Sequence, residues 1–91
     1  MIYNDGREYK GTWFNDKMHG RGEFTWPEGK SYVGDYEEDL KEGFGKMIYG
    51  NGSYYEGEWS RGKQHGKGLY IDNQGRRFEG TWLDGTMSQH L

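Results

Sequence analysis

The chain repeats itself at an interval of 23 residues, with no insertion anywhere along its length. Shifting the sequence by this interval aligns an aromatic column, a glycine column two residues later and a second aromatic column two residues after that. The aligned residues are Tyr9, Tyr32, Tyr55 and Phe78, then Gly11, Gly34, Gly57 and Gly80, then Trp13, Tyr36, Trp59 and Trp82. A fixed period of this length indicates a repeat architecture in which each unit packs mainly on its neighbours.

Each unit has the pattern of a β-hairpin. Tyr9, Gly11 and Trp13 alternate with Lys10 and Thr12, a period of two that is typical of a strand with one buried face. Residues that accept a positive φ follow the strands, as tight turns require. The two turn columns hold Asp16, Asp39, Gly62 and Gly85, and Asp5-Gly6, Glu28-Gly29, Asn51-Gly52 and Gln74-Gly75. The sequence predicts an all-β fold, an elongated single-layer twisted antiparallel sheet of tandem 23-residue β-hairpins.

The glycines between the aromatic residues predict how this sheet packs. A glycine between two same-face rings leaves a gap in the pleated surface, where a ring from the neighbouring strand or unit can lie flat. Only 31% of the residues are apolar, whereas 18% are aromatic, so burial must come mainly from large rings. One unit alone buries too little to offset the entropy of ordering its chain, so neighbouring units must stabilise one another.

The period divides the chain into five segments. Residues 1–8 read as the end of a preceding partial repeat, residues 9–31, 32–54 and 55–77 as three complete units, and residues 78–91 as a partial repeat or cap. Met1 and Tyr3 fall in the columns of Phe24 and Trp26, so the chain begins inside a second strand. We expect a piece or a cap of a longer array, with sheet ends that favour pairing with another chain.

The motif Tyr9-Lys10-Gly11-Thr12-Trp13, followed by His19-Gly20-Arg21-Gly22, resembles a MORN (membrane occupation and recognition nexus) repeat, and residues 55–68 are the copy most similar to it. The second unit departs from the pattern with Tyr36 for Trp and Glu42 for His. The resemblance implies the hairpin-repeat fold and a role in binding. It also implies a setting like that of radial-spoke and parasite cytoskeleton proteins, junctophilins, or enzymes that carry an accessory MORN region, such as plant phosphoinositide kinases and lysine methyltransferases.

The residue types in the sequence argue against catalysis and metal binding by the chain. The absence of cysteine excludes disulfides and thiolate metal sites. His19 and His65 lie in one column but in different units, with Glu42 between them, so we expect no metal site. The serines lack a paired base, and the carboxylates lack an enclosed pocket. We therefore predict no enzyme activity, no metal and no cofactor.

Charge and hydropathy restrict the partners and the compartment. A net charge of −3 argues against nucleic acid as a partner. No apolar run approaches the length of a membrane helix, and the first residues lack the pattern of a signal peptide. We expect a cytoplasmic protein, and the resemblance adds a cytoskeletal or ciliary setting.

Three hypotheses for binding remain open. In the first, partly exposed rings accept an extended or helical segment of a partner protein. The candidate rings are Tyr9, Trp13, Tyr32, Tyr36, Tyr55 and Trp59. In the second, basic residues attach the chain to phosphoinositides in a membrane. The candidates are Arg61, Lys63, Lys67, Arg76 and Arg77, which five acids between Asp35 and Glu42 oppose. In the third, the acidic second unit of one copy pairs with the basic third unit of another.

Overall fold

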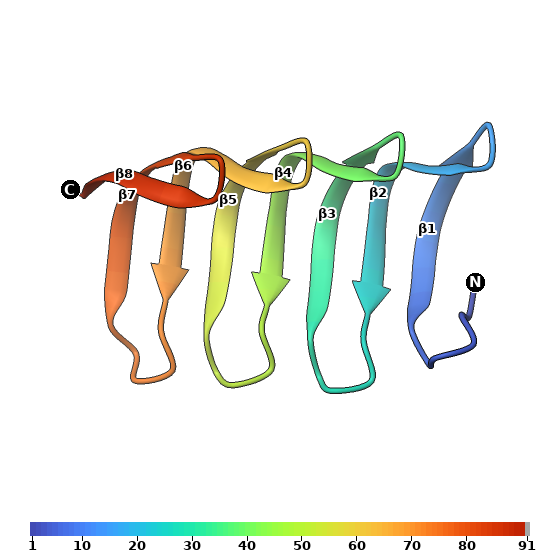
Figure 1. The fold of residues 1–91 in the computed structure, drawn as a ribbon, viewed down its shortest axis with the longest axis horizontal. Helices are drawn as coiled ribbons and strands as arrows, with labels where there is room; N and C mark the ends of the chain where they lie inside the picture. Colours follow the sequence, from blue (N-terminus) through green and yellow to red (C-terminus); the bar gives the residue numbers. More distant parts are fainter. Residues whose placement is uncertain (91) are drawn as a thin grey trace.

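The described residues form one antiparallel sheet of eight strands that pair in the order of the sequence. The structure is a computed structural model that describes the backbone of residues 1–90 and the side chains of residues 1–86, so Leu91 of the expected fourth unit lies outside it. The strands are β1 (Glu8–Phe14), β2 (Lys17–Thr25), β3 (Ser31–Glu37), β4 (Leu40–Ile48), β5 (Tyr54–Ser60), β6 (Lys63–Ile71), β7 (Arg77–Leu83) and β8 (Thr86–His90). They lie side by side from β1 at one end of the molecule to β8 at the other (Figure 1). The predicted all-β sheet of tandem hairpins is confirmed.

Two kinds of connection alternate along the chain. The turns inside the hairpins place two consecutive residues at positive φ, for example Glu38 at 49° and Asp39 at 72°, the signature of a type I′ turn. The connectors between hairpins contain a glycine at positive φ, such as Gly29 at 96°, whose N–H donates to the carbonyl oxygen of Trp26 at 3.2 Å. The hairpin turns line one edge of the sheet and the connectors line the other (Figure 1). Both predicted turn columns are therefore confirmed.

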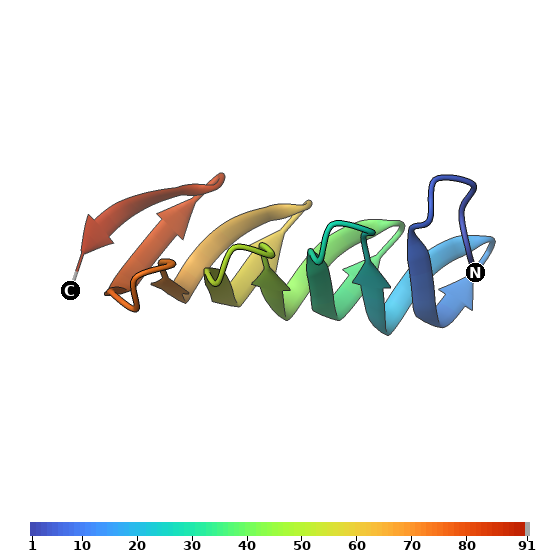
Figure 2. The ribbon, with the colours of Figure 1, turned by 90° about the horizontal axis from the view of Figure 1, so that it is seen from below.

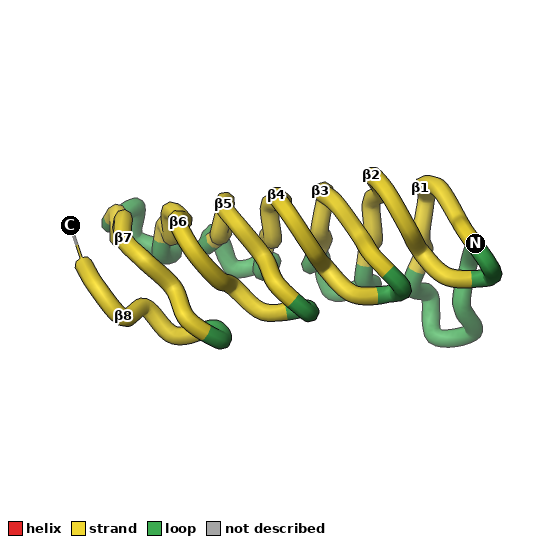
Figure 3. Tube along the Cα trace, turned by 90° about the horizontal axis from the view of Figure 1, so that it is seen from above, coloured by secondary structure: helices red, strands yellow, loops and turns green. Residues whose placement is uncertain are grey.

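Every hairpin is bent at a bulge. The pairing between β5 and β6 shifts register between Gly57 and Trp59, and Gly66 opposite this point has φ of 78°. The side chain of Glu58 holds the bulge, because its Oε1 accepts a hydrogen bond from the backbone N–H of Lys67 at 2.7 Å. The same register shift occurs in the two preceding hairpins. Bulges of this kind bend a strand, and the backbone of the sheet is bent, as seen from below in Figure 2 and from above in Figure 3. We call the concave side of the bent sheet, which the side chains of the core occupy, the groove.

A row of glycines crosses the sheet from one strand to the next. Gly22 pairs with Gly11 on one side and with Gly34 on the other, and the row continues through Gly45, Gly57, Gly68 and Gly80. Tyr9 lies over this row, since a Cβ added to Gly22 would come within 2.6 Å of the Tyr9 ring. The ring that fills the gap thus belongs to the same strand as Gly11, and it also covers the glycine of the neighbouring strand.

The buried core is a ladder of rings along the inner face of the groove. Tyr9, Tyr32 and Tyr55 are completely buried. Tyr32 meets the edge of Tyr36 from its own unit at 5.2 Å between ring centroids, and the edge of Trp59 from the next unit at 5.4 Å. Tyr9 and Tyr55 make the same pairs of contacts. Edge-to-face rings attract one another through their quadrupoles, so each unit is stabilised by its neighbour.

Backbone hydrogen bonds also join successive units at the hairpin turns. The N–H of Asp39 donates to the carbonyl oxygen of Met18 at 3.0 Å, and the N–H of Gly62 donates to that of Lys41 at 2.9 Å. The N–H of Gly85 repeats the contact with Gln64 at 2.9 Å. These bonds recur at the 23-residue interval, so the turns are held in one line along the edge of the sheet.

Candidate functional site

The structure buries most of the rings that the sequence proposed as a binding surface. The expected partial exposure is wrong for five of the six, which are Tyr9, Tyr32, Tyr36, Tyr55 and Trp59. Their faces and edges are occupied by one another. The hydroxyls of Tyr9, Tyr32 and Tyr55 are occupied as well, because each donates to a backbone carbonyl oxygen three residues further on, as Tyr55 Oη does to Glu58 at 2.9 Å. Burial raises the pKa of Tyr55 to about 12. These rings act first as core residues.

Trp13 is the exception, with 42% of its surface exposed. It meets the edge of Tyr9 at 5.0 Å, but residues 1–8 contain no counterpart of Tyr9 that would cover its other side. Met1, Trp13 and Asp16 line a shallow cavity of about 370 Å³ at this end of the groove. Trp13 is therefore the most exposed of the six candidate rings.

Basic side chains of the chain itself lie over rings in residues 1–8 and in the first unit. The guanidinium of Arg7 lies 4.9 Å from the centroid of Tyr3, and Lys30 Nζ, 23 residues further on, lies 5.1 Å from Trp26. Cations over aromatic faces at these distances are attracted by the ring quadrupole. Arg7 and Lys30 occupy the same repeat column, and each therefore places a cation over the ring at the start of its own connector.

Lys41 occupies a more complete aromatic cage. Its Nζ lies 5.4 Å from the centroid of Tyr32, 5.7 Å from Trp59 and 6.0 Å from Trp26. Burial is the main cause that lowers the pKa of Lys41, and the charge of Lys30 lowers it further. The three rings come from three successive units, so this cage is a product of the repeat.

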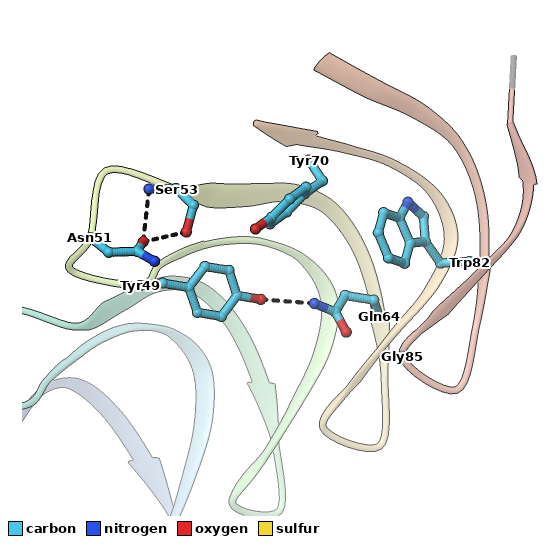
Figure 4. Close-up of a pocket in the computed structure, with 7 residues that line it drawn as sticks. All are labelled: Tyr49, Asn51, Ser53, Gln64, Tyr70, Trp82 and Gly85. Carbon is cyan, nitrogen blue, oxygen red and sulfur yellow. Dashed lines mark hydrogen bonds between the residues drawn. The ribbon is translucent and has the colours of Figure 1, made fainter. Parts of the chain in front are cut away.

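The space one repeat further on, bordered by Tyr49 of the second unit, Gln64 of the third and Trp82 of the fourth, has the rings without the cations. Ser53 stands in the column of Lys30, and Gln64 stands in the column of Lys41. An open cavity of about 420 Å³ results, and Figure 4 shows Tyr49, Tyr70 and Trp82 around it. We call this space the third-unit pocket. Its lining residues are Tyr49, Asn51, Ser53, Gln64, Tyr70, Trp82 and Gly85.

Hydrogen bonds fix one side of the third-unit pocket. Gln64 Nε2 donates to Tyr49 Oη at 2.9 Å, and the Ser53 backbone N–H donates to Asn51 Oδ1 at 3.0 Å. Burial is the main cause that raises the pKa of Tyr49, so its hydroxyl is protonated at neutral pH. The reading of the sequence missed this pocket. Its signal in the sequence was Ser53, a neutral residue in a column that otherwise holds Arg7, Lys30 and Arg76.

The basic residues proposed as lipid contacts do not form one patch. They are Arg61, Lys63, Lys67, Arg76 and Arg77. Arg61 and Lys63 lie at the turn between β5 and β6, whereas Arg76 and Arg77 lie at the opposite edge of the sheet, where Arg77 pairs with Ile71. The span from Lys63 to Ile71 is on the order of 25 Å for a strand of this length, and less after the bend. Arg76 is also engaged by Asp72 at 2.7 Å.

Two further features bear on chemistry and membranes. Within residues 1–86, no three histidine, aspartate or glutamate side chains gather closely enough to hold a metal ion. The described part of the chain contains no helix with the length and hydropathy needed to cross a bilayer.

The repeat is matched by one family model. The model of the MORN repeat matches residues 9–31, 32–54 and 55–75, which together cover more than half of the chain. A comparison with curated proteins finds no match. MORN repeats are a non-catalytic repeat module that is usually involved in binding. Three successive matches on bent hairpins with this ladder of rings lead to one conclusion: the chain belongs to the MORN repeat family.

Proposed function

We propose that this chain is a non-catalytic protein-interaction module, which binds an extended or helical segment of a partner protein in the groove of its bent sheet. The observation that supports this role is the third-unit pocket. Around Trp26 and Tyr32, rings and lysines of the chain itself lie against one another, whereas Tyr49, Tyr70 and Trp82 border open space. Aromatic side chains that border a pocket are the usual anchors of protein interfaces. By family resemblance, the module serves a cytoskeletal, ciliary or membrane-proximal assembly.

A peptide library selected against the immobilised chain tests this role. We expect selected peptides to shift the NMR signals of inner-face residues around Tyr49 and Trp82. Tyr70→Ala should weaken their binding by about tenfold, the typical effect of losing an aromatic anchor. Leu69→Ala is the matched control, since Leu69 neighbours Tyr70 but faces the outer side of the sheet. Shifts confined to the outer face, or a library without binders, would contradict the proposal.

A second copy of the chain is a further partner that the charges favour. Glu37 and Glu38 are exposed beside the second hairpin turn, and Arg61 and Lys63 lie at the third. In an antiparallel pair, the acidic turn of each copy would face the basic turn of the other, which gives complementary potentials. Sedimentation equilibrium at about 100 µM chain should show dimers at low ionic strength and fewer at about 0.5 M salt, because salt screens such pairs. A monomer under both conditions would contradict the pairing of two copies.

Phosphoinositide attachment is the weaker alternative because the basic residues lie at opposite edges of the sheet. Lipid recognition needs clustered Lys and Arg, each of which contributes about 1 kcal/mol near an anionic surface. We expect the chain to stay in the supernatant when liposomes with and without phosphoinositides are sedimented at physiological salt. Strong pelleting that depends on the phosphoinositide would favour membrane attachment over the protein-interaction role.

A further inference from the structure

We propose that the third-unit pocket binds a cationic side chain, lysine or arginine, of a partner polypeptide. This inference rests on the proposed protein-interaction role and specifies the chemistry that its groove recognises. It follows from a comparison of the chain with itself, because equivalent positions in the repeats show what the same rings hold elsewhere.

Two repeats and one repeat before Tyr49, the equivalent rings are covered by cations of the chain itself. Arg7 lies over Tyr3 at 4.9 Å, and Lys30 lies over Trp26 at 5.1 Å. Lys41 Nζ lies within 6.0 Å of the centroids of three rings. The three rings around Lys41, which are Trp26, Tyr32 and Trp59, therefore accommodate an ammonium group.

One repeat after the cage of Lys41, the rings are kept and both cations are missing. Tyr49, Tyr55 and Trp82 are the counterparts of the three rings around Lys41, while Ser53 and Gln64 are shorter and neutral. Tyr70 adds a ring where the preceding unit has Met47, and it lies 6.3 Å from Tyr49 and 6.5 Å from Trp82 between centroids. The pocket is thus richer in aromatic surface than the cage of Lys41, and it opens to solvent.

Two basic residues that neighbour the pocket in the sequence are directed elsewhere. Arg76 follows Ser53 by one repeat, and its Nε is held by the carboxylate of Asp72 at 2.7 Å. Lys63 precedes Gln64 on β6 and therefore points to the opposite face of the strand. Among residues 1–86, those that line the pocket carry no positive charge. The side-chain Oε1 of Gln64 and the hydroxyl oxygens of Tyr49 and Tyr70 are acceptors for the N–H groups of an incoming cation.

Two short peptides test the inference by NMR. The first is a blocked Gly-Gly-Lys-Gly-Gly peptide, and the second is identical except that its lysine is Nε-acetylated and therefore neutral. We expect the first to shift the indole N–H signal of Trp82 in a saturable way, with a dissociation constant in the millimolar range, and acetylation to weaken binding about fivefold or more. The indole of Trp13 is an internal control because it is exposed but has no cage. Equal binding of both peptides, or equal responses at Trp13 and Trp82, would overturn the inference.

A variant that fills the pocket from within provides the second test. Ser53→Lys recreates the arrangement of Lys30 over Trp26, so the added ammonium should occupy the face of Tyr49 and abolish the response of Trp82 to the lysine peptide. Asn4→Lys is the matched control, because it adds the same charge at an exposed position in the first connector and should leave binding unchanged. Undiminished binding by Ser53→Lys, with the native spectrum retained, would place the peptide elsewhere and contradict the inference.

The outcomes separate this inference from the proposed function. If library-selected peptides bind the groove but are indifferent to lysine acetylation and to Ser53→Lys, the cation site is wrong and the protein-interaction role stands. If neither selected peptides nor the lysine peptide binds, both are wrong.

Discussion

Glycine and tyrosine residues pack as pairs in this sheet, and a methyl group added to the glycine would overlap the tyrosine ring. The row that runs through Gly22, Gly45 and Gly68 has no side chains, so the rings of Tyr9, Tyr32 and Tyr55 can lie directly against the backbone. Each tyrosine then uses its hydroxyl to hold the backbone near the bulge of its own hairpin. The role of these glycines is therefore steric.

Gly68→Ala should destabilise the fold strongly. A Cβ at this position would overlap the ring of Tyr55, and overpacking of a core typically costs about 1–3 kcal/mol or more. Gly75→Ala is the control, because a Cβ there meets nothing within 4 Å, and only the positive φ of 84° adds strain, about 1 kcal/mol. Urea unfolding measures both variants. A Gly68→Ala variant no less stable than Gly75→Ala would refute the packing of Tyr55 on the glycine row.

The buried tyrosines predict loss of stability in alkali. Burial raises the pKa of Tyr55 from 10.0 to about 12, and it also raises the pKa values of Tyr32 and Tyr36. Above pH 10 the unfolded chain loses these protons while the folded chain keeps them, so stability falls as the pH rises from about 10 to 12. Each such tyrosine contributes at most about 1.4 kcal/mol per pH unit. Unfolding free energies measured by urea at pH 8, 10 and 11 check this. A flat profile would contradict it.

The hairpin turns predicted from the sequence are also found in the structure, because these turns depend on local residue types. Positions with two successive positive φ values are occupied by Asn15-Asp16, Glu38-Asp39, Arg61-Gly62 and Asp84-Gly85. Glutamate tolerates this conformation poorly, whereas asparagine and glycine adopt it readily. The second hairpin is therefore the one whose turn is least suited to its backbone.

Glu38→Asn should stabilise the chain by about 0.5–1 kcal/mol, because asparagine relieves the strain at φ of 49°. Asp39 is left in place, since its carboxylate accepts a hydrogen bond from the Met18 N–H at 2.7 Å. The ion pair of Glu38 with Lys17 is long, at 3.9 Å, and exposed, so its loss matters little. Glu37→Asn, at the end of β3, is the control and should bring no gain. Thermal melting distinguishes the two variants.

The bend of the sheet could not be predicted from the sequence pattern. Period-two alternation predicts strands and their faces, but the bulge depends on Gly66 at positive φ and on Glu58 bonding to the backbone across the hairpin. The bend brings the rings of three units together on the inner face, and for that reason the expected exposure of Tyr32 or Trp59 was wrong. The third-unit pocket depends in turn on Ser53 and Gln64, which look unremarkable until the geometry shows that lysines fill the equivalent space.

Considered as a whole, the described chain is a stack of similar units whose strands contact mainly the strands next to them in the sequence. The ladder of rings and the hydrogen bonds between turns recur every 23 residues. In such a protein, stability is close to a sum over units and the interfaces between them. The long dimension of 39 Å is accordingly set by the number of strands.

Deletion of residues 32–54 should leave a folded chain, because Tyr9 can then meet Trp59 as it now meets Tyr36. The long axis should shorten by about 10 Å, the width of two strands, and the stability should fall with the loss of one interface. Deletion of residues 32–43 removes about half a unit and is the control, since it places strands out of phase. Small-angle scattering and near-ultraviolet circular dichroism check both. A half-unit deletion that folds as well as the full-unit deletion would contradict the modular account.

The placement of the strands has a mechanical consequence. Because β1 and β8 lie at opposite ends of the sheet (Figure 1), tension applied between them acts along the hydrogen bonds and perpendicular to the strands. The load then reaches one strand pair at a time, so the sheet should peel open stepwise at low force. A tether that contains this array would lengthen in increments of a hairpin and act as an extensible spring.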